Sequence, residues 1–443
     1  MNRFTICILA ALFLAAGSAV AEDSDRWPQW RGSDGQAVAE EATPPIEWSE
    51  EKNIKWKSEL PGLGISTPIV WKDRIFLTTT VDTGKLGPNQ PEPEPEGSGR
   101  RRPGPSPNIY QWILMAIDRN DGSVIWSRVA REDQPHEGMH PTSTQASNSP
   151  VTDGTHVFAF FGSQGIYAYD FDGQLVWEKD LGDMRTRNSF GEGASPALHG
   201  NTLIINWDHE DDSFIVALDK RTGEEIWRRA RPDEPTSWSS PVIVEHGGAT
   251  QVIVNAYHRV TSYDLATGET IWEVPGMTLN VVPTPMVGDG VVYLASGFRG
   301  NALMAVKLDG AKGDLTGSDN VLWTYEKDTP YVPTPVLYDG LIYMLKSNKG
   351  LLSVINAENG ELVYGIERLD NVRNVYASAM AADGKVYFVG RDGGTTVVKA
   401  GRTFEVLADN MLDDAFDASP VAVGNQLFLR GRNNLYCIEE SKP

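Results

Sequence analysis

The sequence predicts an all-β protein, an eight-bladed β-propeller of four-stranded antiparallel sheets, and three observations support this fold class. A unit of mostly 41–50 residues recurs along the chain, and each copy opens with Ser or Thr followed by Pro, or once by Ala. Each copy contains short apolar runs of strand length and most close on an aromatic residue. The last copy stops after three runs, whereas the chain begins with one run that has no partners of its own. Repeats of this length with four strands are typical of propellers.

The unit at 148–177, NSPVTDGTHVFAFFGSQGIYAYDFDGQLVW, shows the four expected strands most clearly. Asp153-Gly154, the SQG segment and Asp172-Gly173 separate the apolar runs, and glycine reaches the positive φ angles that tight turns need. One such sheet cannot bury both of its faces, so it needs copies of itself. The units open at Pro68, Pro150, Pro196, Pro241, Pro285, Pro335, Ala379 and Pro420, and the closing aromatic residues are Trp126, Trp177, Trp227, Trp272, Trp323, Tyr364 and Phe404.

The two ends of the array predict how the ring closes. Trp56 precedes Pro68 by 12 residues, which is the spacing from Trp323 to Pro335. We therefore expect residues 53–57 to be the fourth strand of the eighth sheet, in a propeller that spans residues 53–441. Such a closure removes the open sheet edges that an unclosed array would leave.

Residues 1–21 have the pattern of a cleaved signal peptide. Arg3 precedes an apolar run at 4–16, and Ala19-Val20-Ala21 forms an A-x-A cleavage site. The run is too short to span a bilayer, and no cysteine follows it as a lipoprotein signal would require. We expect an exported protein, periplasmic or extracellular, with no membrane anchor.

The net charge narrows the possible partners, and the cysteine content decides whether an internal disulfide can form. Without residues 1–21 the chain keeps 38 of its 39 Lys and Arg and all 60 Asp and Glu, a net charge of −22. This balance argues against nucleic acid or an anionic membrane as a partner. Cys437 is then the single cysteine, so no internal disulfide can form and we expect it to be a small buried residue of a third strand.

Two segments fall outside the repeat. Residues 22–52 contain WPQWRG, and we expect Trp27 and Trp30 to pack across the propeller as a plug or strap, with an exposed binding motif as the alternative. Residues 81–108 are an insertion in the first blade that contains PEPEPEGSGRRRPGPSPN. Proline, glycine and charge dominate it, so we expect disorder or extended chain, although it could also dock a partner.

Candidate ligand residues gather on the face that carries the blade-to-blade connections and the turns between second and third strands. Its loops are the longer ones, and functional residues sit on loops held by a rigid scaffold. The predicted ligand residues are arginines that would form a positive well and aromatic residues that could stack on a ring: Arg185, Arg187, Arg259, Arg299, Arg373, Arg391, Arg430, Arg432, Trp238, Tyr331 and Tyr376. Guanidinium groups select carboxylate, sulfate or phosphate, so an acidic saccharide or an acidic peptide would suit the face. The alternative is that each arginine pairs with a nearby acid, such as Asp208, Glu210, Asp392 or Asp417, and holds the loops in place.

An acidic run offers a second candidate. Asp208, Glu210 and Asp212 could supply oxygen ligands to a hard cation such as calcium, but the run lacks the glycine and the spacing of a calcium loop. A hairpin tip that is simply acidic is the competing interpretation. His136, His140, His209 and His258 could meet across the channel, yet they lack the paired spacing of a metal motif. No nucleophile motif is visible.

The repeats, such as YDFDGQLVW and LDKRTGEEIW after an SP or TP start, resemble the pyrroloquinoline quinone (PQQ) repeat. That repeat occurs in eight-bladed quinoprotein alcohol dehydrogenases and in BamB, and here it covers residues 53–438. WPQWRG with IEWSEEKNIKWKSELPG further resembles secreted PQQ-like propeller proteins of planctomycete-type bacteria, which are mostly of unassigned activity. The motif is specific for the fold and not for the cofactor.

The chain also departs from these relatives. The dehydrogenases place two adjacent cysteines beside the quinone, and their calcium ligands and catalytic Asp have no counterpart here by motif. BamB-like proteins carry a lipidated cysteine that this chain lacks. We therefore expect a secreted or periplasmic non-catalytic scaffold, without a cofactor, that binds a protein partner or an anionic ligand on its long-loop face. A PQQ- and calcium-dependent quinoprotein dehydrogenase is the alternative.

Overall fold

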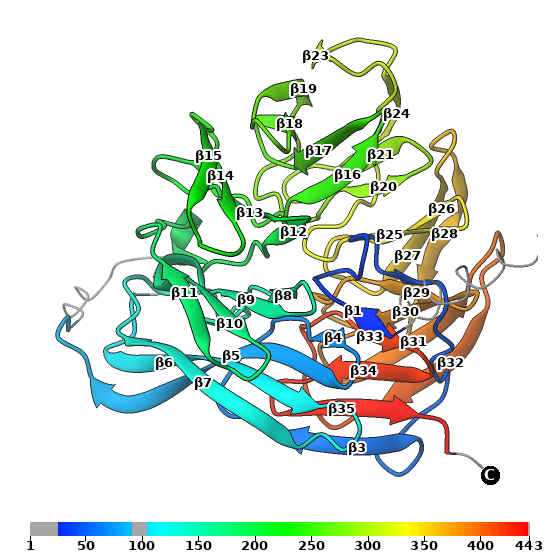
Figure 1. Ribbon diagram of the computed structural model, residues 1–443. Helices are drawn as coiled ribbons and strands as arrows, with labels where there is room; N and C mark the ends of the chain where they lie inside the picture. The colour runs from blue at the N-terminus through cyan, green and yellow to red at the C-terminus, as the bar shows by residue number, and fades with distance from the viewer. Residues whose placement is uncertain (1–24, 91–103, 442–443) are drawn as a thin grey trace, which may run out of the picture.

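A computed structural model describes residues 25–90 and 104–441, and it confirms the predicted fold class. Eight small sheets are arranged around a central axis, as Figure 1 shows. The two 3-10 turns, η1 (Gly162–Gln164) and η2 (Arg187–Ser189), are the helical elements of the described residues. Across this part of the chain, no helix is long and apolar enough to cross a membrane. The predicted signal peptide lies outside the described residues.

Each blade runs from an inner first strand to an outer fourth strand. Blades one to four contain β4 (Ile69–Trp71), β5 (Arg74–Leu86), β6 (Asn108–Asp118) and β7 (Val124–Asp133); β8 (Val151–Thr152), β9 (His156–Phe160), β10 (Ile166–Asp170) and β11 (Leu175–Lys179); β12 (Ala197–His199), β13 (Thr202–Trp207), β14 (Phe214–Asp219) and β15 (Glu225–Ala230); and β16 (Val242–His246), β17 (Ala249–Val254), β18 (Arg259–Asp264) and β19 (Thr270–Pro275), with β23 (Gly313–Asp314) added at the outer edge. Blades five to seven contain β20 (Met286–Gly288), β21 (Val291–Ser296), β22 (Ala302–Lys307) and β24 (Val321–Tyr325); β25 (Val336–Tyr338), β26 (Leu341–Leu345), β27 (Leu351–Asn356) and β28 (Leu362–Arg368); and β29 (Met380–Ala382), β30 (Lys385–Val389), β31 (Gly394–Lys399) and β32 (Val406–Met411).

The eighth blade closes the ring as predicted. Its chain order is β33 (Val421–Val423), β34 (Gln426–Arg430) and β35 (Asn434–Glu439), and its outer strand is β3 (Ile54–Glu59) from the other end of the chain. Trp56 of β3 lies opposite Cys437 of β35, which is fully buried. The first and last segments of the propeller are thus joined in one hydrogen-bonded sheet.

Tryptophan and glycine residues join successive blades at the outer strands. The Trp56 indole N–H donates to the carbonyl of Arg119 at 2.9 Å, and that of Trp177 donates to the carbonyl of Lys220 at 2.8 Å. Each ring packs on a turn glycine of the next blade: a Cβ on Gly122 would lie 2.6 Å from the Trp56 ring. That glycine also has a φ of 77°. The turn and the packing therefore both require glycine.

The Ser or Thr that opens each unit forms a closed circle of hydrogen bonds around the axis. In each of the eight blades its backbone N–H donates to the hydroxyl of the same residue in the next blade, at 2.9–3.3 Å. The circle runs through Thr67, Ser149, Ser195, Ser240, Thr284, Thr334, Ser378 and Ser419 and returns to Thr67. The recurring hydroxyl residue is therefore a blade-to-blade clasp as well as a strand start.

The N-terminal strap, residues 25–49, crosses the central channel, as expected for a plug. Its strand β1 (Arg26–Trp27) pairs with the inner strand of blade one, and β2 (Val38–Ala39) pairs with the inner strand of blade seven. Between them, the carbonyl of Pro28 accepts the Thr152 N–H of blade two at 2.8 Å, and Gln36 accepts the Val287 N–H of blade five at 2.6 Å. Trp27 is 3 % exposed, so it is not part of an exposed motif.

Disorder or extended chain was expected over residues 81–108, and at both ends of the insertion the chain is extended rather than disordered. Strand β5 continues to Leu86 and pairs with the start of β6, so that Asp82 lies opposite Tyr110 and Leu86 opposite Asn108. The Gln134 side chain links the two ends of the insertion, since it accepts the Asn89 N–H at 2.8 Å and donates to the carbonyl of Ser106 at 2.9 Å. At these two ends, the pairing of β5 with β6 outweighs the tendency of a sequence rich in proline, glycine and charge to be disordered. Residues 91–103 lie outside the described part.

Candidate ligand-binding funnel

A cavity of about 390 Å³ lies on the axis at the long-loop face, and we call it the funnel. Six hydroxyl residues of the clasp circle line it: Thr67, Ser149, Ser195, Ser240, Ser378 and Ser419. Because these residues stand where the inner strands begin, the funnel opens toward the blade-to-blade connections. Trp30 also lines it and reaches it from the strap, which enters along the inner strands from the opposite side. Trp30 therefore forms the floor.

Aromatic side chains from the blade-to-blade connections and from one hairpin turn form the walls. Phe298 and Tyr331 are stacked with ring centroids 4.7 Å apart, and His140 meets Phe190 edge-on at 5.0 Å. The three aromatic residues predicted as stacking partners, Trp238, Tyr331 and Tyr376, all line the funnel. Phe190 and Phe298 were missed, although they lie in the same kinds of loop, because a single aromatic residue in a loop has no period that would reveal it. Trp30 was expected in a plug or strap, with a binding motif as the alternative, and was not among the predicted stacking residues.

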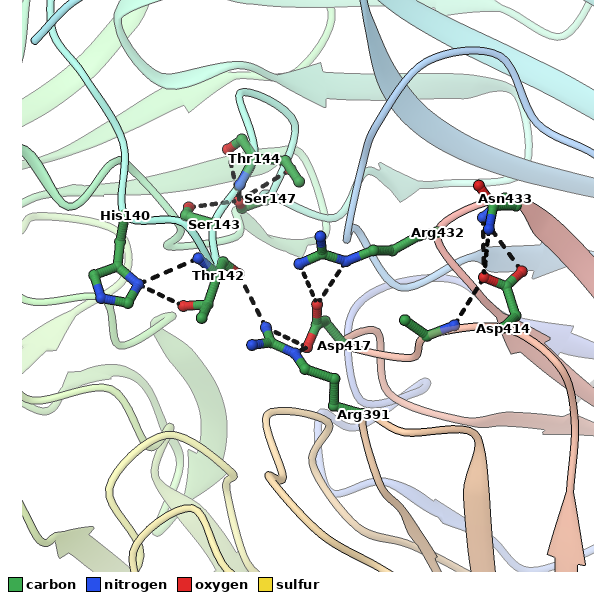
Figure 2. A network of polar contacts seen from close by, with 11 residues as sticks. His140, Thr142, Ser143, Thr144, Ser147, Arg391, Asp414, Asp417, Arg432 and Asn433 are labelled. Carbon is green, nitrogen blue, oxygen red and sulfur yellow. Dashed lines mark hydrogen bonds and ion pairs between the residues drawn. The ribbon is translucent and has the colours of Figure 1, made fainter. Parts of the chain in front are cut away.

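Figure 2 shows an ion-pair cluster of Arg391, Asp417 and Arg432, and Asp417 lines the funnel. Arg391 Nε donates to Asp417 Oδ1 at 2.7 Å, and Arg432 Nη2 donates to Asp417 Oδ2 at 3.1 Å. The Asp417 side chain has no exposed surface, whereas the two arginine side chains are 18 % and 29 % exposed. Arg391 also lies 4.1 Å over the Tyr376 ring, and its Nη2 contacts the carbonyl of Thr142 across the mouth at 3.4 Å.

The other predicted arginines do not converge on the funnel, except that Arg299 reaches its wall residue Phe298. Arg185 and Arg259 pair at exposed positions with Asp211 and Glu273, because an acid in a neighbouring loop or strand is within reach. Arg299 is exposed and stacks on Phe298 with its Cζ 5.4 Å from the ring centroid. Arg373 is exposed, and Arg187 lies in η2.

Arg430 is also misplaced by the sequence prediction, since it lies inside the wall. Its side chain is fully buried and donates to the carbonyls of Ser66 at 2.8 Å and Thr78 at 2.7 Å. Much of the predicted arginine set therefore follows the alternative in which arginines hold the loops together.

The predicted cation site is not assembled. Asp208 is buried and paired with Arg231, whose Nε lies 2.7 Å from Oδ1. Glu210 accepts hydrogen bonds from Thr236, and Asp212 is exposed. Among the described residues there is no group of three or more His, Cys, Asp or Glu that could hold a metal ion. The backbone of this turn directs adjacent carboxylates to separate partners.

Glu192 is a carboxyl group of the funnel wall that sequence reasoning did not identify. Its Oε2 accepts the Ser163 N–H at 2.8 Å and its Oε1 accepts the Ser163 hydroxyl at 2.5 Å. Burial raises the pKa of Glu192 to about 7, and Glu137 adds to this rise, while the Ser163 bonds and His136 oppose it. Burial and the nearby Arg391 lower the pKa of His140.

Together, the fold and the funnel define a closed eight-bladed propeller with a blind cavity on its axis. The family model described as outer membrane protein assembly factor BamB matches residues 32–206 and 211–442. The chain therefore belongs to this family of PQQ-like propellers, as its repeats had indicated.

Individual relatives are more distant. Polyvinylalcohol dehydrogenase of Sphingopyxis sp. (strain 113P3) is 25 % identical over 267 residues, which are 48 % of this chain and 40 % of that relative's length. BamB of Moraxella catarrhalis matches with a TM-score of 0.57 at 13 % identity, over 87 % of this chain and 97 % of that one. Quinohemoprotein alcohol dehydrogenase of Comamonas testosteroni matches with a TM-score of 0.64 at 11 % identity, over 96 % and 82 % of the two chains. These structural likenesses show the fold alone.

Proposed function

We propose that the protein is an exported, non-catalytic binding propeller that takes an anionic ligand at the funnel on its long-loop face. The observation that carries this proposal is the cluster of Arg391, Asp417 and Arg432 beside the aromatic walls. Two guanidinium groups share one carboxylate, so the cluster keeps one positive charge in a chain whose formal net charge is −21. The export proposal rests on the signal pattern in residues 1–21.

The geometry of the cluster leaves donors for a ligand. In the described part of the chain, the Nη1 groups of Arg391 and Arg432 have no hydrogen-bond acceptor, and both side chains are partly exposed. Asp417, by contrast, is covered and holds the two arginines in place. A carboxylate or sulfate at the mouth would receive charge-assisted hydrogen bonds, which are stronger than neutral ones.

Binding of acidic ligands at two salt concentrations tests the proposal. Oligogalacturonate and a glutamate-rich peptide should be titrated against the protein, with the neutral galactose oligomer as the matched ligand. Arg299→Ala combined with Arg391→Ala should remove anion binding while Arg432 continues to neutralise Asp417, so stability should change little. Arg185→Ala with Arg259→Ala removes the same number of charges away from the funnel and should leave binding intact. No anion binding at low salt, or unfolding of the first double variant, would contradict the proposal.

A quinoprotein dehydrogenase is the second candidate, because the curated relative and several structural neighbours carry dehydrogenase names. The aromatic funnel would accommodate a flat ring such as PQQ. Calcium fits less well, since the described residues offer no cluster of three acid or histidine side chains and both oxygens of Glu192 are engaged by Ser163. Adding PQQ with calcium and measuring binding and dye-linked alcohol oxidation decides between the two, since turnover would overturn the non-catalytic proposal.

A further inference from the structure

The N-terminal strap brings a buried guanidinium next to the funnel floor. Arg31 is 2 % exposed and donates to the carbonyls of Gly35, Gln36 and Pro335 at 3.1, 3.0 and 2.9 Å. Its Nη1 has no hydrogen-bond partner, and within the described ranges no carboxylate lies at ion-pair distance from it. Burial lowers the pKa of Arg31 to about 9 although the nearby Asp34 opposes this shift, and the group stays protonated at neutral pH.

This charge lies against the floor residue itself. The Arg31 Cζ is 5.8 Å from the centroid of the Trp30 ring, and Trp30 lines the funnel. A second fully buried guanidinium, Arg430, lies inside the wall and, among the described residues, bonds to Ser66 and Thr78 beside the lining residues Ile65 and Thr67. Buried charges are normally paired, because an isolated charge is expensive to remove from water. Two buried guanidinium groups without an ion-pair partner among the described residues therefore lie beside the funnel, Arg31 at its floor and Arg430 in its wall, and Asp34 offsets part of the Arg31 charge from beyond ion-pair distance.

The clasp circle adds hydrogen-bond donors at the same level. Each hydroxyl of the circle accepts a backbone N–H from the neighbouring blade, and for the six that line the funnel no acceptor of their own hydrogen is found within residues 25–90 and 104–441. A hydroxyl can donate once in addition to accepting. The floor is thus an aromatic ring surrounded by hydroxyl donors, which suits a ligand with oxygens around its perimeter.

We propose that the strap is part of the ligand site and that the ligand is an acidic saccharide, one ring of which stacks on Trp30 with its oxygens facing the hydroxyl circle. The buried guanidiniums of Arg31, next to the floor, and of Arg430, inside the wall, favour its negative charge, and Arg391 and Arg432 bind its acid group at the mouth. This inference rests on the proposed function, because it names the ligand class of the same funnel. The cavity of about 390 Å³ is within the range of small-molecule sites.

Calorimetric titration with digalacturonate and with the matched neutral galactose disaccharide tests this assignment. Trp30→Ala should weaken digalacturonate binding by at least about tenfold, whereas Trp30→Phe should stay within about threefold because a ring is retained. Gln29→Ala changes the strap beside the floor and serves as the control, with unchanged affinity expected. Arg31→Met should reduce the preference for digalacturonate over the neutral disaccharide and leave the affinity for the neutral one unchanged.

The outcomes separate this inference from the proposed function. If Trp30→Ala binds digalacturonate as the wild type does, while Arg299→Ala with Arg391→Ala abolishes binding, the strap is not part of the site and the proposed function stands. If only the glutamate-rich peptide binds, the ligand class is wrong. If Arg31→Met unfolds, the Trp30 variants decide the question. If no anion binds at low salt, both proposals fail.

Discussion

At the scale of single residues, Glu192 is a carboxyl group of the funnel wall whose raised pKa keeps it protonated up to about pH 7. Its carboxyl group is turned into the wall toward Ser163, and Gly162 makes this possible, because a Cβ at Gly162 would lie 1.2 Å from Glu192 Oε2. The other ionisable groups that act on Glu192 are His136 and Glu137, from the connection between blades one and two. The glycine and the glutamate are 30 residues apart in the sequence, so no local pattern reveals the pair.

The raised pKa of Glu192 predicts a pH-dependent stability. The folded protein keeps this proton up to about pH 7, whereas the unfolded chain loses it near the ordinary value of 4.5. The free energy of unfolding should therefore fall as the pH rises from about 4.5 to about 7 and then level off. Glu192→Gln should remove this part of the pH dependence, measured by urea unfolding at pH 5, 6, 7 and 8. Glu269→Gln, at an exposed turn, is the control, and an unchanged slope in Glu192→Gln would contradict the expectation.

At the scale of single elements, the inner strands are short, and a hydrogen bond just before each of them links it to the neighbouring blade. Strands such as β8 and β12 have only two or three residues, yet two residues before each of them stands a Ser whose hydroxyl receives an N–H from the neighbouring blade. The proline that follows has no N–H to donate and fixes φ, which suits the residue immediately before a strand.

Removing one hydrogen bond of the circle should lower the free energy of unfolding by a measurable amount. Ser195→Ala leaves the buried N–H of Ser149 without an acceptor, and such a group costs about 1–3 kcal/mol. Chemical denaturation should show this destabilisation, and Ser195→Thr should recover most of it because the hydroxyl is restored. Ser127→Ala, on the outer strand β7, should change stability by less than about 0.5 kcal/mol. Equal effects of the two alanine variants would show that the circle has no special energetic role.

The blade-one hairpin predicts two different results for two loop replacements. Exchanging residues 91–103 for a short Gly-Ser linker should leave the melting temperature nearly unchanged, because loop length contributes little to closure entropy. Exchanging residues 88–107 also removes Asn89 and Ser106, which are the hydrogen-bond partners of Gln134, and this exchange should lower the melting temperature. Equal melting temperatures for both replacements would show that the Gln134 contacts contribute nothing.

At the scale of the whole molecule, the sequence predicted the fold far better than the site. Repetition displays the same Trp, Gly and Ser/Thr-Pro positions up to eight times, so the blades and the closing strand could be recognised without coordinates. The funnel has no such repetition, because each blade contributes a different side chain from an irregular connection. Trp30 comes from outside the repeats, and whether Arg391 meets a ligand or Asp417 depends on loop geometry that spacing does not encode.

Ring closure predicts that the two ends of the chain are as strongly coupled as any two neighbouring blades. Trp56 and Trp177 are 8 % and 9 % exposed, and each donates its indole N–H to a carbonyl of the following blade. Trp56→Ala should therefore cost about as much as Trp177→Ala, about 3–5 kcal/mol, when unfolding is followed by circular dichroism. Deletion of residues 22–57 should cost more, because it removes β3 and the strap together. A small cost for Trp56→Ala, with an early separate transition of the eighth blade, would mean that the closing strand frays and that the ring does not unfold as one unit.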